Sequence, residues 1–191
     1  MKLLLGTLKM SENKDRIAQK TFAICTVTMS FNAIEDRIVM DSLDQSKKVE
    51  RLWLSRRLLD RLIPTLTDQL EVDSSKTIPT ELEQSLAQEK AEMDKQQSKA
   101  VEIKPKNPSW LVTHIQIGRS KNKFRLLFLG KNTEEPMATN NQANFDLAIP
   151  NLRQWLNALH KIYLKAEWET KAFPSWLNEN NPKSGKNILL N

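Results

Sequence analysis

Cysteine, histidine and glycine are all scarce in this chain of 191 residues, and each shortage excludes a class of site. The single cysteine, Cys25, cannot form an internal disulfide, and one cysteine with two histidines is too few for a structural zinc site. The four glycines lie too far apart for a phosphate-binding loop or a dinucleotide-binding motif. We therefore expect no metal and no cofactor, and a reducing, cytoplasmic setting.

Long apolar runs are also absent. No run approaches the roughly 18 apolar residues of a membrane span, so we expect no membrane partner. The short run Leu3 to Leu5 ends at Gly6, before the apolar core of a signal peptide can form, which predicts a non-secreted protein. Met10 is an alternative start of translation to Met1, and residues 1–20 are predicted to be a flexible extension.

What the sequence does contain is two similar series of patterns. In the first, residues 21–31 alternate with Cys25 on the predicted core side, and extended stretches follow at 37–43 and 49–54. Leucine and isoleucine at three- and four-residue spacing then predict a helix over 56–71, with Ser55 as its N-cap and a kink at Pro64.

The second series has the same order. Stretches at 110–118, 123–130 and 144–149 predict three strands, and Pro150 opens an amphipathic helix that continues to about residue 166. The fold class is therefore α+β, as a tandem β-β-β-α repeat with units at 21–72 and 108–170. We expect one antiparallel sheet, or two crossing ones, with both helices packed on one face and a C-terminal tail at 171–191.

Residues 73–107 separate the two units and are predicted to be a charged linker or a solvated helix. They contain seven acidic and six lysine residues and no aromatic residue. Thr80 to Glu83 match a capping box, which favours a helix. Leu82, Leu86 and Met93 offer only a thin apolar stripe, so a disordered segment is the alternative.

Few side chains suggest catalysis. Cys25 is interpreted as a small buried hydrophobic residue, because it falls on the predicted core face with no general base near it in sequence. His114 and His160 are interpreted as surface or boundary residues. The sequence therefore predicts no enzyme and no catalytic residue.

Basic and aromatic residues suggest a binding surface instead. The net charge is +6, with half of the excess in residues 1–20. The side of the sheet opposite the core is predicted to present aromatic and cationic side chains, and the turn near residue 120 to present a basic cluster. The predicted binding residues of this surface are Arg51, Trp53, Trp110, His114, Arg119, Lys121, Lys123 and Arg125. Such a mixture suits both base stacking with phosphate contacts and a protein interface.

One part of the second unit resembles a known family. The segment 123–129, followed by 145–150 and then by Leu152 and Trp155, is similar to the strand-to-helix end of a PUR repeat. The layout as a whole is similar to the PUR and Whirly folds, which bind single-stranded nucleic acids, although a PUR unit has four strands and this chain shows three. The resemblance implies single-stranded DNA or RNA as a partner.

The C-terminal tail adds an apolar cluster that contains Phe173 and Trp176. Such a cluster either packs back onto the domain or inserts into a partner's groove. We predict a non-catalytic binding or assembly module that acts through the open sheet face and this apolar segment. The expected partner is another protein or a second copy of the chain, and the alternative is single-stranded nucleic acid bound by the sheet aromatics and the basic hairpin.

Overall fold

The computed structural model describes residues 21–72, 74, 77–131 and 141–178, which form six strands and four helices. The strands are β1 (Phe22–Asn32), β2 (Arg37–Asp44), β3 (Val49–Ser55), β4 (Ser109–Ser120), β5 (Lys123–Lys131) and β6 (Asn141–Ala148). The helices are α1 (Arg56–Glu71), α2 (Thr80–Met93), α3 (Ile149–Lys165) and α4 (Ser175–Asn178). The predicted α+β class is confirmed. The predicted extension at 1–20 and the tail beyond residue 178 lie outside the described residues.

Local sequence signals account for the two long helices. The Ser55 side chain accepts a hydrogen bond from the Leu58 amide at 3.4 Å and so caps α1 as predicted. Pro64 lies inside α1, which continues beyond it to Glu71. Pro150 lies in the first turn of α3, where its missing N–H costs no helical hydrogen bond.

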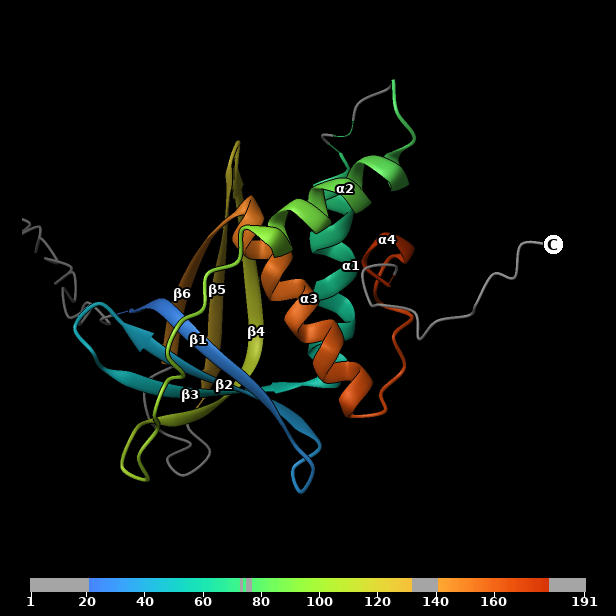
Figure 1. Cartoon of the computed structure of the whole chain (residues 1–191). Helices are drawn as coiled ribbons and strands as arrows, with labels where there is room; N and C mark the ends of the chain where they lie inside the picture. Colours follow the sequence, from blue (N-terminus) through green and yellow to red (C-terminus); the bar gives the residue numbers. More distant parts are fainter. Residues whose placement is uncertain (1–20, 73, 75–76, 132–140, 179–191) are drawn as a thin grey trace, which may run out of the picture.

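The six strands close into a barrel in the order β1-β2-β3-β4-β5-β6 (Figure 1). Within each half the strands pair antiparallel, but β3 pairs parallel with β4, and β6 with β1. The expected antiparallel pairing, in one sheet or in two crossing ones, is therefore wrong at these two places. Closure explains the difference, because the first strand of each half pairs with the last strand of the other and covers both edges.

The two parallel strand pairings, which we call seams, are short, and this leaves room for the helices. The β1–β6 seam contains three residue pairs, from Phe22–Ala143 to Ile24–Phe145, and the β3–β4 seam also contains three. Past these pairs the strands separate, and α3 packs against β1, β5 and β6 while α1 packs against β3 and β4. Figure 1 shows the helices gathered on one side of the barrel. The core is therefore shared between the barrel interior and the apolar stripes of α1 and α3.

Each half also contains one strand irregularity next to its seam. In β1 the register shifts between Ile24 and Thr26, so Cys25 is an extra residue without a partner on β2. A bulge reverses which side chains face inward. Phe22 and Ile24 are buried on one side of it, and Cys25 is exposed. The predicted burial of Cys25 is wrong because a regular alternation across residues 21–31 ignores this bulge.

Residues 80–93 form a helix rather than a disordered segment, which decides between the two alternatives for this part of the linker. The expected capping box does not form, because the N-cap residue is Pro79 and no side-chain hydrogen bond caps the helix there. No helix in the described part of the chain is long and apolar enough to cross a membrane.

The close contact between Gly130 and the ring of Trp110 yields a first expectation. A Cβ atom at Gly130 would overlap the Trp110 ring and the carbonyl oxygen of Leu111, both of which are held by the barrel. Gly130→Ala should therefore lower the free energy of unfolding by about 1–3 kcal/mol, the usual cost of overpacking. Chemical denaturation monitored by circular dichroism measures this change.

Gly118→Ala is the matched control on the neighbouring strand. A Cβ atom there would meet the Cβ of Arg125 at 3.6 Å and its carbonyl oxygen at 3.9 Å, both of which are ordinary van der Waals contacts. We expect this variant to stay within about 0.5 kcal/mol of the parent protein. Equal stability of the two variants would contradict the packing of Gly130 against Trp110.

Candidate binding surface

The bulge in β4 decides which aromatic residues reach the surface. The register shifts between Val112 and His114, so Trp110 faces the interior, where it is 1% exposed, while His114 is exposed outside. Trp110 was predicted to lie on the outer face with His114, and that placement is wrong because the bulge separates the two. The Trp110 indole N–H donates to the Glu50 carboxylate at 3.0 Å. Burial raises the pKa of Glu50, although this hydrogen bond opposes the shift.

The apolar C-terminal segment packs against its own helices. Phe173 is 5% exposed and lies edge-on to His160 and Tyr163, with ring centroids 4.9 and 5.0 Å away. Trp176 is 2% exposed, donates to Glu71 at 2.7 Å and lies beneath the Arg153 guanidinium. In this structure both predicted binding residues belong to the core, so they present no surface to a partner.

Arg51 and Trp53 lie together on β3, on the outside of the barrel. The Arg51 guanidinium donates two hydrogen bonds to Asp41, at 2.7 and 2.9 Å, which raise its pKa. It also lies 5.8 Å from the centre of the Trp53 ring, whose N–H donates to the Ser109 hydroxyl at 2.8 Å. Both are partly exposed, but Arg51 already has a carboxylate partner and is a poor candidate for a phosphate contact.

The predicted basic cluster lies on the hairpin between β4 and β5. Arg119, Lys121, Lys123 and Arg125 are all exposed, as expected. Arg125, however, donates two hydrogen bonds of 2.6 Å to Asp146 on β6, and these lower the pKa of that carboxyl. Arg119 lies with its guanidinium 5.4 Å from the centre of the Phe124 ring. Within the hairpin, Lys121 and Lys123 are therefore the cations best placed to meet an anionic ligand.

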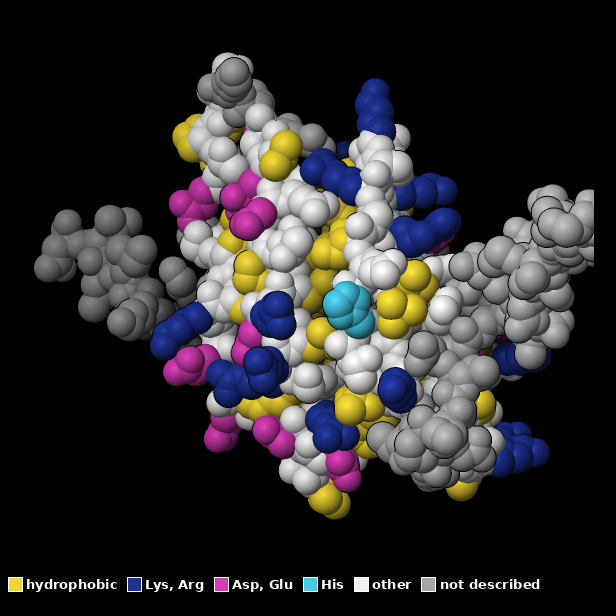
Figure 2. Space-filling view, turned by 180° about the vertical axis from the view of Figure 1, so that it is seen from behind, with side chains coloured by type: hydrophobic (Ala, Val, Ile, Leu, Met, Phe, Trp, Pro, Cys, Tyr) yellow, Lys and Arg dark blue, Asp and Glu magenta, His cyan; other side chains and the backbone are white. Residues whose placement is uncertain are grey.

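The outward side chains of β4, β5 and β6 form one continuous surface, which we call the β4–β6 surface. Cross-strand pairing aligns His114 with Leu129 and Gln142, and Gln116 with Leu127 and Asn144. The surface consists of His114, Gln116, Lys123, Arg125, Leu127, Leu129, Gln142, Asn144 and Asp146. Figure 2 shows a histidine at the middle of this side of the molecule, hydrophobic side chains beside it, and Lys and Arg side chains around the projecting hairpin at the top.

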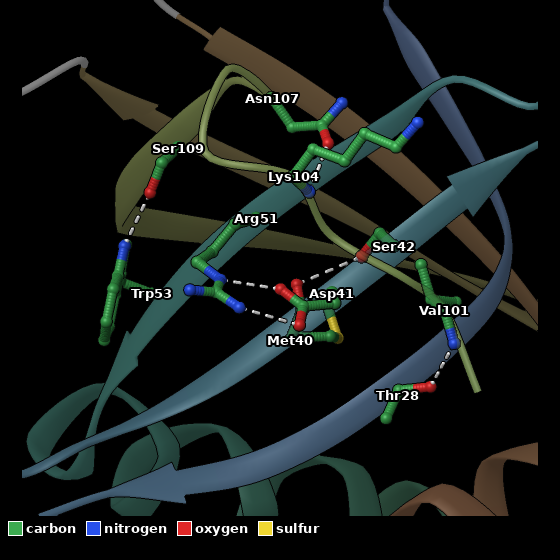
Figure 3. A network of polar contacts seen from close by, with 10 residues as sticks. All are labelled: Thr28, Met40, Asp41, Ser42, Arg51, Trp53, Val101, Lys104, Asn107 and Ser109. Atoms are coloured by element: carbon green, nitrogen blue, oxygen red, sulfur yellow. Dashed lines mark hydrogen bonds and ion pairs between the residues drawn. The ribbon is translucent and has the colours of Figure 1, made fainter.

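The corresponding outer side of β1, β2 and β3 is covered by the chain itself. The Val101 amide donates to the Thr28 hydroxyl at 2.8 Å, and the Arg51 amide donates to the Pro108 carbonyl at 2.8 Å. Figure 3 shows the segment from Val101 to Ser109 lying over these strands, around the Asp41–Arg51 ion pair. Asp41 is 8% exposed as a result. No described segment covers the β4–β6 surface in the same way.

The residues considered for catalysis are dispersed. Cys25 is exposed and donates only to the carbonyl of Ala23, at 3.7 Å. His160 is 2% exposed against Phe173, so its predicted position at the surface or boundary is wrong. Among the described residues, no three His, Cys, Asp or Glu side chains form a group that could hold a metal ion.

A hollow of about 840 Å³ lies elsewhere, between α3, β1, β6 and the chain after α2. Its lining includes Cys25, Asn151, Trp155 and Lys161. The Trp155 indole N–H has no hydrogen-bond partner among the described residues, but it is also closed off from the hollow by burial. A ligand in this hollow could not reach that donor without a rearrangement.

Sequence reasoning missed the acidic partners of the arginines. Asp41 and Asp146 lie directly opposite Arg51 and Arg125 on neighbouring strands. Opposite charges at matching positions of paired strands were the available signal, and they could be read only once the strand register was known. Comparisons of the chain with protein-family models, with curated proteins and with solved structures find no match.

Proposed function

We propose that this protein is a non-catalytic module that binds another macromolecule through the β4–β6 surface. One observation carries the proposal: the outer sides of the two halves of the barrel differ in what covers them. Over β1 to β3 the chain's own segment 101–108 shields the strands, whereas the outer side of β4 to β6 is open among the described residues.

The covered half indicates what the open half is suited to bind. A segment of the chain itself, residues 101–108, lies on the outer side of β1 to β3 and contributes the Val101 amide and the Pro108 carbonyl to hydrogen bonds with these strands. On the open side, Leu127 is partly exposed between Gln116 and Asn144, and Leu129 is partly exposed between His114 and Gln142. Apolar side chains bordered by polar ones are typical of the centre and rim of a protein interface. We therefore favour a polypeptide segment of a protein partner.

The tandem β-β-β-α repeat is part of this proposal. Each half contains three antiparallel strands followed by a helix, and the first strand of each begins with a three-pair parallel seam. A bulge follows each seam, at Cys25 and at Thr113. This correspondence supports an origin from one repeated unit, in which the covered and open outer sides occupy equivalent positions.

A photo-crosslinking amino acid at Gln116 tests the protein-binding function in the cells that naturally make this chain. Because Gln116 is exposed at the middle of the β4–β6 surface, irradiation should yield discrete adducts with a partner protein. Electrophoresis followed by mass spectrometry identifies them. The matched control is the same amino acid at Asp68, an exposed position of α1. Absence of adducts at 116, or identical adducts from both positions, would contradict the proposal.

Single-stranded nucleic acid is the second candidate ligand, favoured by a specific feature of the hairpin. Lys121 and Lys123 are exposed at its tip, next to Arg119 and at the end of the β4–β6 surface. Phosphate contacts by such lysines would make binding depend on salt. His114 and the partly exposed Trp53 are the aromatic groups that could stack bases.

A salt titration distinguishes this second function from the first. Fluorescence anisotropy of a labelled mixed-sequence oligonucleotide should show binding that weakens steeply between about 50 and 200 mM salt. Replacing Lys121 and Lys123 by Gln should reduce the slope of log K against log salt by about 1.4, since each single-strand phosphate contact contributes about 0.7. Lys104→Gln, at an exposed position over β1 to β3, should leave the slope unchanged. Absence of binding at the lower salt concentration rejects this candidate.

A further inference from the structure

Helix α2 faces the solvent with its apolar side. Leu82, Leu86 and Met93 are 52%, 55% and 75% exposed, whereas Gln84 and Gln88 on the opposite side are 3% and 0% exposed. A surface helix normally buries its apolar stripe and exposes its polar residues. The reversed arrangement in α2 leaves an apolar ridge uncovered, and exposed apolar surfaces of this kind mark sites of association.

Hydrogen bonds beneath α2 hold it in this orientation. The Gln84 amide donates to the Leu70 carbonyl at 3.2 Å and to the Ser74 hydroxyl at 2.7 Å. The Gln88 amide donates to the Arg153 carbonyl at 3.2 Å. A rotation that turned Leu82 and Leu86 inward would break these bonds and leave their buried polar partners unsatisfied. The exposed ridge is therefore a stable feature of the fold.

The charged residues within the ridge indicate which kind of molecule covers it. Glu89 and Lys90 are exposed between Leu86 and Met93, and no ion pair with another described residue is present for either. They cannot pair with each other, because adjacent residues of a helix point in different directions. A second α2 that runs antiparallel would bring Glu89 opposite the partner's Lys90, and Lys90 opposite the partner's Glu89. The same alignment places Leu86 opposite the partner's Met93.

We propose that α2 is a self-association surface, through which two copies of this chain pair antiparallel about a two-fold axis near Glu89 and Lys90. The occupant of the ridge is thus a second copy. Such an interface is isologous, so each contact occurs twice. Because it lies on α2, it is separate from the β4–β6 surface and does not depend on the function proposed for that surface.

The oligomeric state in solution tests this proposal. Sedimentation velocity from about 1 to about 200 µM covers the weak affinity expected when each partner contributes one helix to a small interface. We expect a reversible monomer–dimer equilibrium within this range. Leu86→Glu should shift the protein to monomer, and Leu164→Glu, at an exposed apolar position of α3, is the matched control that should leave the equilibrium unchanged.

Reversing the charge at Glu89 or at Lys90 makes the test specific for an antiparallel α2 pair, and neither substitution changes a buried residue. Glu89→Lys and Lys90→Glu should each weaken dimerisation by about fivefold or more, since each replaces two attractive pairs by two repulsive ones. An equimolar mixture of these two variants should associate more tightly than either alone, because only the mixed dimer pairs every charge. Circular dichroism confirms that each variant is folded.

Three results would overturn the proposal. The first is a monomer at every concentration, and the second is a dimer that Leu86→Glu leaves intact. The third is a mixture of Glu89→Lys and Lys90→Glu that associates no better than its components. Each of these results leaves the photo-crosslinking test at Gln116 unaffected, so the two proposals fail independently.

Discussion

The two short parallel seams are the constraint on which the rest of this structure depends. Three residue pairs join β1 to β6, and three join β3 to β4, and together they turn two antiparallel three-stranded units into one closed barrel. Closure pairs the strand edges that each unit would otherwise expose. Because the seams are short, the strands separate beyond them, and α1 and α3 bury their apolar stripes there. Loss of either seam would open both the barrel and the core.

The bulges beside the seams decide the character of the surface. In β4 the extra residue places Trp110 inside against Gly130 and Glu50, and leaves His114 outside. The uncovered β4–β6 surface is consequently less aromatic than the sequence alone indicates. Its one arginine, Arg125, is paired with Asp146. What remains is an apolar and amide-rich centre beside a lysine-bearing hairpin, and on this composition we propose a protein ligand in preference to nucleic acid.

Much of the secondary structure could be predicted from local patterns, because these depend on neighbouring residues. The alternating stretches and the leucine spacing after Ser55 place the strands and α1 close to their observed limits. Barrel closure could not be predicted, since it depends on pairing between Phe22 and Ala143, residues that are distant in sequence. The bulges could not be predicted for a related reason. The extra residue that each bulge adds, Cys25 in β1 and Thr113 in β4, does not distinguish the composition of its strand from that of a regular strand. The burial of Phe173 and Trp176 likewise requires α2 and α3 to be in place.

The most direct test of this account is the reactivity of the Cys25 thiol in the native protein. With the bulge, Cys25 is exposed although Val27 and Met29 pack against the core on the same strand. With regular alternation, Cys25 would share their inward side. Titration with a thiol reagent such as Ellman's reagent should therefore modify one cysteine in the native state, at a rate close to that of the denatured chain. A thiol that reacts only after unfolding would contradict the bulge in β1 and the assignment of inner and outer surfaces that follows from it.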